Sequence, residues 1–448
     1  MTARQARECV RRAARPITDN PKDFTPLLDL IGDARFVLIG EESHGTQEFY
    51  RDRAELTKLL IREKEFCAVA AEADWPDAHG ITSYVSGKSN GGAAGAERSL
   101  SRFTRFPLWM WRNTEVLKFV RWLHDHNAAS DEEPVGFYGL DLYSLFGSVK
   151  AVLDFLESTN PEEARRARER YDCLGLLSSD DGQAYGYRLT AGQNGDCEDE
   201  VLEQLVALRE QQAAFLSADG RRARDDFFYA HQNARLVHSA EQYYRAMFSG
   251  KENTWNLRDR HMAETLEELA NHLSQHQPNP KIVVWAHNSH IGDARFTDMG
   301  MRRGQLNLGQ LARERYRRGA ILIGFSTYSG TVTAASRWGG VMERKTVRPA
   351  LEESYEALFH EARSGESFLL PLHANREIFE ALLPERLERA IGVIYRPETE
   401  RFSHYFDASL SRQFDAVIHR DVTSAVEPLD HSLRWNKERV PETYPHGL

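Results

Sequence analysis

The sequence predicts an α/β fold with a largely parallel central sheet flanked by helices and a large helical insertion. Seven short apolar runs each have the length of a strand buried on both faces, and helical patterns separate most of them. Strands that alternate with helices form a mainly parallel sheet covered on both sides. These runs are residues 36–39, 66–71, 135–140, 282–286, 320–325, 391–395 and 414–418.

The second observation concerns residues 147–280, where strand signals vanish and long patterns of charged and apolar residues take their place. A chain of 448 residues also exceeds the size of one ordinary hydrophobic core. We therefore expect residues 1–146 and 281–448 to form the α/β core that carries an active-site cleft. Residues 147–280 are expected to form a helical insertion or cap.

Composition narrows the class of protein. The formal net charge of -10 argues against nucleic acid as a partner, because binding to phosphates needs concentrated Lys and Arg. No apolar stretch approaches the 18 residues expected of a membrane span. Four cysteines without metal-type or redox-type spacing fit a reducing compartment. With no apolar signal segment evident, the sequence predicts a cytoplasmic protein.

The most informative stretch is RFVLIGEESHGTQEFY, residues 35–50, which predicts a strand, a sharp turn and a helix. Ligands bind at the carboxyl ends of strands in open α/β sheets. His44, three residues after Glu41, is the leading candidate for a general base, because a carboxylate commonly orients and tunes such an imidazole. Alternation along the chain turns Glu42 away, so it is interpreted as a charge near the helix N-terminus.

Three later runs end in the same way. Glu72, Asp141 and His287 each follow an apolar run directly, and parallel strands would bring all of these side chains to one edge of the sheet. His290 follows His287 at a spacing that could chelate a metal on a helical turn, or it could be a packing neighbour. We expect Glu41, His44, Glu72 and His287 to meet in one cleft.

Arg53 lies in the helix expected after the turn, within the apolar stripe of Phe49, Leu56 and Leu60. A guanidinium that faces a core must find a carboxylate, because an unpaired buried charge costs several kcal/mol. Glu41, Glu72 or a substrate would serve as the partner. A purely structural ion pair is the alternative.

Some catalytic arrangements are absent from the sequence. Ser43 has Gly45 after it but Glu41 two residues before it, so no nucleophile elbow is present. There is no HExxH helix, and no GxGxxG motif follows a strand. These absences favour a water molecule over a serine as the nucleophile.

Several segments together resemble the erythromycin esterase family. They are GEESHGTQEFY (40–50), EADWPD (72–77), FPLWMWRN (106–113), GFYGLDLYS (136–144), ENTWNLRDRHMAE (252–264) and VVWAHNSHI (283–291). The resemblance implies an α/β core with helical additions and a hydrolase of the type that opens macrolide lactones. It also implies that His44 acts on water without a required metal or other cofactor. Glu41, Glu72, Arg53, His287 and His290 would match the family's site residues.

The sequence thus predicts a metal-independent esterase whose partner is a small-molecule ester or lactone. Arg53 or His287 would stabilise the oxyanion, and His290, Asp141, Trp109 and Trp111 would line the substrate site, although both tryptophans also fit a core. Two alternatives stay open. One is a hydrolase that uses a divalent metal held by the same Glu and His side chains. The other is a non-catalytic protein that binds a small ligand or a polysaccharide.

Overall fold

The computed structural model describes residues 2–18, 20–88, 92–175, 184–187, 197–211, 221–250 and 253–430. The chain divides into two compact units. The first contains residues 1–72, 80–137 and 277–448, and the second contains residues 73–79 and 138–276. The sequence placed residues 73–79 and 138–146 with the core and residues 277–280 with the insertion, so the two divisions differ there. The predicted domain boundaries stay a prediction.

Among the described residues, nine strands form one mixed sheet, and two further strands pair with each other. The strands of the main sheet are β1 (Arg15–Pro16), β2 (Phe36–Ile39), β3 (Phe66–Asp74), β4 (Gly136–Asp141), β5 (Lys281–Trp285), β6 (Ala320–Ala335), β7 (Met342–Val347), β8 (Phe368–Pro371) and β11 (Ala416–Thr423). The separate antiparallel pair is β9 (Arg386–Arg389) and β10 (Tyr405–Ala408).

The order of the main sheet is β1-β8-β11-β6-β2-β5-β3-β4, and β7 pairs with β6. β2 lies between β5 and β6 and is parallel to both. β11 runs parallel to β6, and β3 runs parallel to β5. The antiparallel pairings are those of β1, β7 and β8. The centre of the sheet is therefore parallel, and the predicted fold class is confirmed.

Six of the seven predicted runs form strands, and one prediction is wrong. Residues 391–395 contain no regular strand; Ile391 and Ile394 only form isolated bridges, with Ser43 and Ala335. The apolar character of this segment reflects burial, since Ile391 and Tyr395 are fully buried. β3 and β6 extend past the predicted ends, and Glu72 consequently lies within β3.

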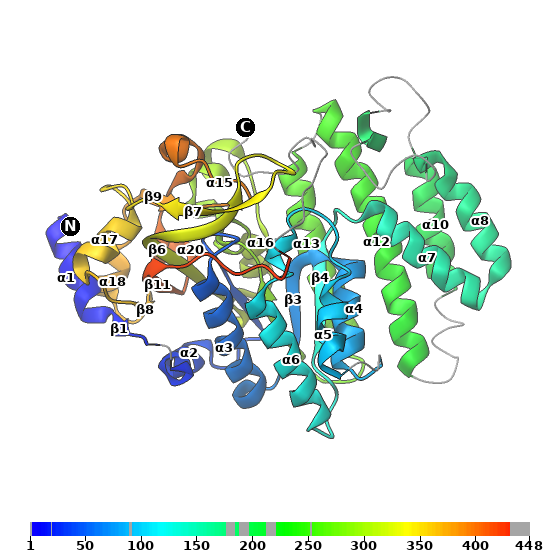
Figure 1. The fold of residues 1–448 in the computed structure, drawn as a ribbon, viewed down its shortest axis with the longest axis horizontal. Helices are drawn as coiled ribbons and strands as arrows, with labels where there is room; N and C mark the ends of the chain where they lie inside the picture. The colour runs from blue at the N-terminus through cyan, green and yellow to red at the C-terminus, as the bar shows by residue number, and fades with distance from the viewer. Residues whose placement is uncertain are drawn as a thin grey trace. The chain divides into compact units, whose positions relative to one another are not determined.

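Helices of the first unit flank this sheet (Figure 1). They are α1 (Ala3–Ala13), α2 (Thr25–Ile31), α3 (Gln47–Lys64), α5 (Gly92–Leu100), α6 (Thr114–Ala128), α14 (Asn288–Ile291), α15 (Asp298–Arg303), α16 (Leu308–Tyr316), α17 (Tyr355–Ala362), α18 (Arg376–Ala381), α19 (Glu400–Ser403) and α20 (Leu410–Gln413). Short 3-10 turns are η1 (Pro21–Phe24), η2 (Leu108–Met110), η4 (Ala294–Phe296), η5 (Arg317–Gly319) and η6 (Pro397–Thr399). α4 (Trp75–Val85) is divided between the two units.

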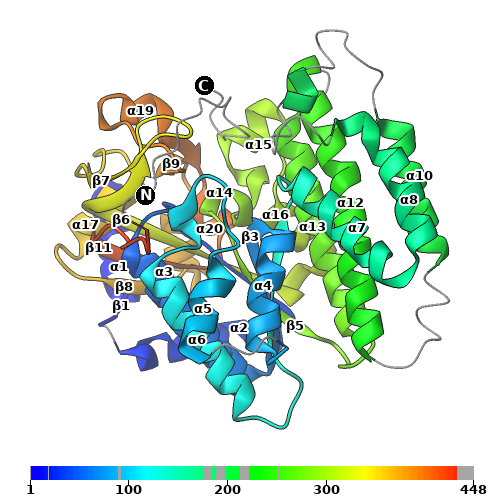
Figure 2. The same cartoon turned by 45° about the vertical axis from the view of Figure 1, so that its right-hand side comes forward.

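The second unit is built mainly from helices. They are α7 (Leu145–Thr159), α8 (Pro161–Tyr171), α10 (Glu198–Glu210), α12 (Arg221–Ser249) and α13 (Thr254–Leu273), with the 3-10 turn η3 (Asp172–Leu174). α12 packs against α7, α10 and α13, as Figures 1 and 2 show. Its own apolar core includes Val152, Leu156, Tyr171, Val237 and Tyr243. This unit therefore has an apolar core of its own, against which Tyr138 of β4 also packs.

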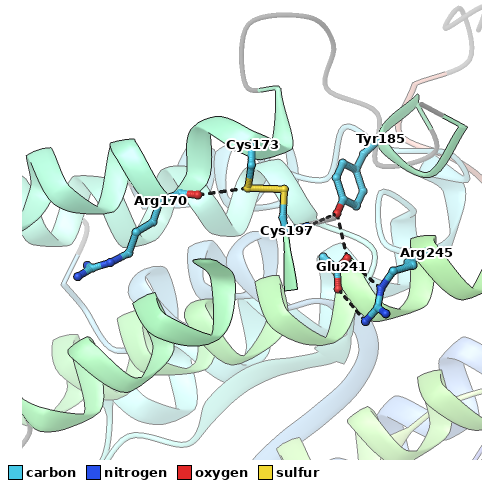
Figure 3. Close-up of a disulfide and its surroundings, with 6 residues drawn as sticks. All are labelled: Arg170, Cys173, Tyr185, Cys197, Glu241 and Arg245. Carbon is cyan, nitrogen blue, oxygen red and sulfur yellow. Dashed lines mark hydrogen bonds and ion pairs between the residues drawn. A yellow bond between two sulfur atoms is a disulfide. The ribbon is translucent and has the colours of Figure 1, made fainter. Parts of the chain in front are cut away.

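A disulfide joins Cys173, in η3, to Cys197, which precedes α10 (Figure 3). Sequence spacing gave no sign of it, because the pairing depends on how the helices of this unit pack. Disulfides are uncommon in reducing compartments. The cytoplasmic location accordingly stays a prediction. Cys9 and Cys67 do not take part in a disulfide.

Within the described residues, no helix has both the length and the apolar character that crossing a bilayer requires. The sequence also predicts a mobile, Gly-rich loop over 178–197 and an irregular surface segment over 428–448. Most of both segments lies outside the described residues, and residues 184–187, which are described, are helical.

Candidate active site

The turn between β2 and α3 is held on several sides by backbone contacts. The amide of Gly40 donates to the carbonyl of Ile323, and the carbonyl of Gly45 accepts from the amides of Thr333 and Val426. Two glycines allow this close packing. A Cβ at Gly40 would lie 2.1 Å from Oδ1 of Asn288, and one at Gly45 would lie 1.9 Å from the carbonyl oxygen of Thr333. The turn is thus fixed by the strands around it.

His44 and Glu41 form a hydrogen bond across this turn. Nδ1 of His44 lies 3.0 Å from Oε1 of Glu41. A carboxylate can only accept, so Nδ1 carries the proton and Nε2 has the free lone pair of the neutral ring. The His44 residue is 7% exposed, and Glu41 is 1% exposed. The arrangement orients an imidazole whose Nε2 can accept a proton.

Arg53 lies behind Glu41 and is fully buried. Its Nη2 is 3.4 Å from Oε2 of Glu41, the oxygen that does not bond His44. The guanidinium lies between the rings of Tyr50 and Trp285, with 4.8 Å to each ring centroid. The structure pairs Arg53 with Glu41, one of the three partners that the sequence allowed. Cation–π contacts with two aromatic rings add to the stabilisation of this buried charge.

Glu72 connects the two histidines that follow β5. Its Oε2 accepts from the backbone amide of His287 at 2.8 Å, and its Oε1 is 3.3 Å from Nε2 of His290. The rings of His287 and His44 have centroids 4.7 Å apart. Glu41, His44, His287, Glu72 and His290 therefore form one continuous buried cluster.

The ring of His287 has a hydrogen-bond partner at each nitrogen. Nε2 donates to the carbonyl of Glu42 at 3.0 Å, and Nδ1 accepts from the hydroxyl of Ser289 at 2.8 Å. Burial lowers the pKa of His287 well below its ordinary value, and the neighbouring His44 lowers it further. His287 is consequently a neutral imidazole held in one tautomer.

The interpretation of Glu42 as a helix N-terminal charge is wrong. α3 begins at Gln47, and Glu42 is fully buried. One oxygen of Glu42 accepts from the backbone amide of Thr327. Burial raises the pKa of Glu42 well above its ordinary value, and the nearby Glu356 raises it further. The expected alternation of side chains did not apply, because this segment is a turn and not a strand. The far side of the sheet is also covered, so a side chain that points away from the cleft is still buried.

Sequence reasoning missed two residues that hold the cluster together. The side chain of Asn288 donates to the carbonyl of Phe325 at 2.8 Å and accepts from its amide at 3.2 Å. The hydroxyl of Tyr50 donates to the backbone carbonyl of His44 at 2.8 Å. Both residues stand in the quoted motifs VVWAHNSHI and GEESHGTQEFY, which was the only available signal.

Three predicted substrate-binding residues have other surroundings. Asp141 belongs to the second unit, where its carboxylate makes two hydrogen bonds to Arg258 at 2.9 and 2.7 Å. Trp109 and Trp111 are 2% and 6% exposed. Trp109 packs edge-on against Phe106, and Trp111 packs against Phe137. These contacts fit the alternative interpretation, in which both tryptophans belong to the hydrophobic core.

Another histidine network lies deeper in the first unit. The hydroxyl of Ser326 is 2.8 Å from Nδ1 of His419, and Nε2 of His419 is 3.3 Å from the carboxylate of Asp421. His419 is fully buried, and Ser326 is 5% exposed. These contacts join side chains of β6 and β11.

The carboxylates of the cluster bond to protein groups rather than converging on one point. In the described part of the chain, no group of three or more His, Cys, Asp or Glu side chains has a geometry suited to a metal ion. Glu41 is engaged by His44 and Arg53, and Glu72 by His287 and His290.

Comparison with known proteins gives a family match. The sequence profile of the erythromycin esterase family matches residues 61–423. These residues include Glu72, Asp141, His287 and His290, whereas Glu41, His44 and Arg53 precede the matched region. An erythromycin esterase type II of Escherichia coli is 23% identical over 424 residues, which cover 91% of this chain and 94% of that protein.

Solved structures share the fold. A succinoglycan biosynthesis protein superposes with a TM-score of 0.75 at 21% identity, covering 96% of this chain and 99% of that one. A mutant of the erythromycin esterase EreC in an open conformation gives a TM-score of 0.67 at 19% identity, covering 93% and 99%.

Proposed function

Since this chain belongs to the erythromycin esterase family, we propose that it hydrolyses a small-molecule ester or lactone with His44 as the general base. Membership supports a hydrolase. The observation that carries the finer proposal is the 3.0 Å contact between Nδ1 of His44 and Oε1 of Glu41. It leaves Nε2 as the atom that can take a proton from water.

In the proposed reaction, the water oxygen attacks the carbonyl carbon while Nε2 of His44 accepts one water proton. The carbonyl becomes a tetrahedral oxyanion, and Glu41 stabilises the imidazolium. Collapse then breaks the bond to the alkoxy oxygen, which takes the proton back from His44 and leaves as an alcohol. General-base help of this kind contributes about two to four orders of magnitude in rate.

Replacing His44 or Glu41 tests this proposal. We expect His44→Ala and Glu41→Gln to lower kcat on a responsive ester at least 100-fold. His44→Ala should melt close to the parent protein, whereas Glu41→Gln, which removes the charge that pairs with the buried Arg53, should melt at a lower temperature. Glu41→Gln keeps an oxygen acceptor, whereas Glu41→Ala also strips the buried Arg53 of its partner. His373→Ala, an exposed histidine of the same unit, is the matched control. Full activity in folded His44→Ala would refute the proposal.

Arg53 is assigned a positioning role, because its side chain is fully buried and lies against Glu41. Arg53→Met should lower kcat much more than it changes KM, and should move the acidic limb of the pH–rate profile upward. The variant removes the positive charge beside the Glu41–His44 pair, and a nearby charge affects ionisation. Arg53→Lys should restore part of the activity, and Arg51→Met on the same helix serves as the control. An unaltered pH profile in Arg53→Met would contradict this role. Stabilisation of the oxyanion by Arg53 or His287 stays a prediction.

The main alternative is a hydrolase that holds a divalent metal with Glu41, His44, Glu72, His287 and His290. The metal-free proposal is favoured because these carboxylates already bond to cationic or N–H groups of the protein. Elemental analysis of purified protein, with activity measured before and after chelation, separates the two. Stoichiometric metal and loss of activity on chelation would establish the alternative.

A non-catalytic binding protein is the remaining alternative, since one fold serves many functions. A screen against a panel of lactones and acyl esters discriminates it from an enzyme. Turnover that depends on His44 would support the hydrolase. Saturable binding without turnover across the panel would support a binding protein.

A further inference from the structure

The second unit contains a cavity of about 310 Å³ between α10, α12 and α13. Its volume falls in the range of small-molecule sites. Every lining residue belongs to the second unit, so the cavity is separate from the cluster around His44.

Three arginines line this cavity: Arg209 from α10 and Arg224 and Arg235 from α12. Arg235 bonds to Gln232 and pairs with Glu264 at 3.3 Å. Among the described residues, Nε of Arg224 is buried and has no hydrogen-bond partner. Glu268 is the one carboxylate among the lining residues. The lining itself therefore holds three guanidinium groups and one carboxylate, in a chain whose formal net charge is -10.

Part of the remaining wall is apolar and aromatic, beside the polar Asn271 and Gln275. Leu205, Phe227 and Phe228 line it. The ring of Phe228 stacks on His272 with centroids 4.0 Å apart and planes 2° apart. His272 is held in turn by Asp225 at 3.1 Å. The aromatic face is thus fixed before any ligand arrives, which lowers the entropic cost of binding.

We propose that this cavity is a second binding site, which takes a small organic anion with a carboxylate or phosphate group on an aromatic or apolar body. Guanidinium groups match the planar, bidentate geometry of both anions. The aromatic wall would cover the body of the ligand. A ligand without the anionic group would not pair with the arginines, and a ligand without the apolar body would not contact the aromatic wall.

His231, which also lines the cavity, gives the site a second readout. Burial, together with the positive charges of Arg235 and Arg209, lowers the pKa of His231 to about 4. The charged or titratable groups around the cavity are Arg209 of α10, then Arg224, Asp225 and Arg235 of α12, and Glu264, Glu268 and His272 of α13. A bound anion would offset the arginines and raise the pKa of His231.

Calorimetric titration of the full chain with phenyl phosphate tests the proposal. We expect saturable binding that weakens about tenfold in Arg209→Gln and in Arg224→Gln, the loss typical of one charge-assisted hydrogen bond. Arg165→Gln, on the exposed face of α8, should bind as the parent protein does. Upward movement of the His231 pKa on binding, followed by NMR, should accompany these changes.

Two further ligands, benzoate and inorganic phosphate, test the anionic group and the aromatic body separately. Benzoate should bind at the same place if a carboxylate suffices, and failure of benzoate alone would restrict the site to phosphates. Inorganic phosphate should bind more weakly than phenyl phosphate. The proposal is overturned if phenyl phosphate does not bind, if both variants bind it as the parent does, or if inorganic phosphate binds equally well.

Discussion

Glu41 bonds to His44 through one carboxylate oxygen and lies against Arg53 through the other. A carboxylate buried without a cation would hold its proton to high pH, and it could not then orient an imidazole as an anion. The guanidinium between Tyr50 and Trp285 supplies that cation. The apolar stripe of α3 that contains Arg53 is therefore part of the proposed site and serves more than packing.

Glu42 is the neighbour of Glu41 and behaves differently. Its pKa is raised by burial, and burial also raises the pKa values of Glu356 and Glu388. A carboxyl with a raised pKa in the folded state binds more protons there than in the unfolded chain. Its contribution to stability is thus complete below the unfolded value of about 4.5 and is lost as pH rises through the folded pKa.

We therefore expect Glu42→Gln to unfold at a higher temperature than the parent protein, with a gain that grows from pH 5 to pH 8. The amide cannot ionise, and its oxygen can still accept from Thr327. Thermal melts over this pH range measure the effect. Glu385→Gln, at an exposed carboxylate, is the control. A constant difference across pH would mean that Glu42 is not protonated in the folded state.

At the scale of elements, parallel strands bring distant turns together. β2 lies between β5 and β6, so the turn after β2 meets the residues that follow β5. Asn288 adds hydrogen bonds from α14 to β6, and its amide donates to the carbonyl of Glu41. The residues of the cluster are consequently held in place mainly by strand pairing and backbone hydrogen bonds.

Gly45→Ala tests how tightly the turn is held. The new Cβ would lie 1.9 Å from the carbonyl oxygen of Thr333, so backbone must move. We expect a loss of about 1–3 kcal/mol in the free energy of unfolding, the usual cost of overpacking, together with lower kcat. Gly147→Ala is the control, because its nearest neighbour would be 3.6 Å away. Denaturant melts and steady-state kinetics check both effects, and equal stability of the two variants would contradict this account.

Local sequence patterns predicted the elements that are buried on both faces. β2, β5 and the first half of β6 were found because continuous apolar runs report such burial. β7 was missed because MERKTV is charged and largely exposed at the edge of the sheet. Residues 391–395 were misassigned because burial alone does not distinguish a strand from a buried irregular segment.

The candidate site was also predicted in part, where local sequence patterns marked its residues. Strand ends marked Glu41, Glu72 and His287, and the stripe on α3 marked Arg53. The partners of Asn288 and the burial of Glu42 depend on tertiary contacts with β6, which no local pattern encodes. Asp141 followed the same strand-end rule, yet it pairs with Arg258 in the second unit.

At the scale of the whole molecule, the chain has two compact units with separate cores. The proposed catalytic cluster lies in the first unit, whereas the disulfide and the arginine-lined cavity lie in the second. Events that destabilise the second unit should therefore be separable from the chemistry at His44 by measuring stability and turnover in parallel.

The disulfide provides that test. Cys173 and Cys197 are 24 residues apart, and closing a loop of this size stabilises a fold by about 3 kcal/mol in the chain-entropy account. Next to it, the hydroxyl of Tyr185 accepts from the amide of Cys197 at 3.1 Å and donates to Glu241 at 2.9 Å (Figure 3). Loss of the bond should loosen these contacts as well.

We expect the double variant Cys173→Ser, Cys197→Ser to melt at a lower temperature than the parent protein. A reducing agent should lower the melting temperature of the parent protein by a similar amount and leave the double variant unchanged. Cys67→Ala, which removes a free thiol of the first unit, should keep the parent's sensitivity to reductant. Differential scanning calorimetry with and without reductant measures all three. The prediction is wrong if reductant makes Cys173 and Cys197 reactive but leaves the melting temperature of the parent protein unchanged. The packing of α8, α10 and α12 would then hold this loop without the disulfide.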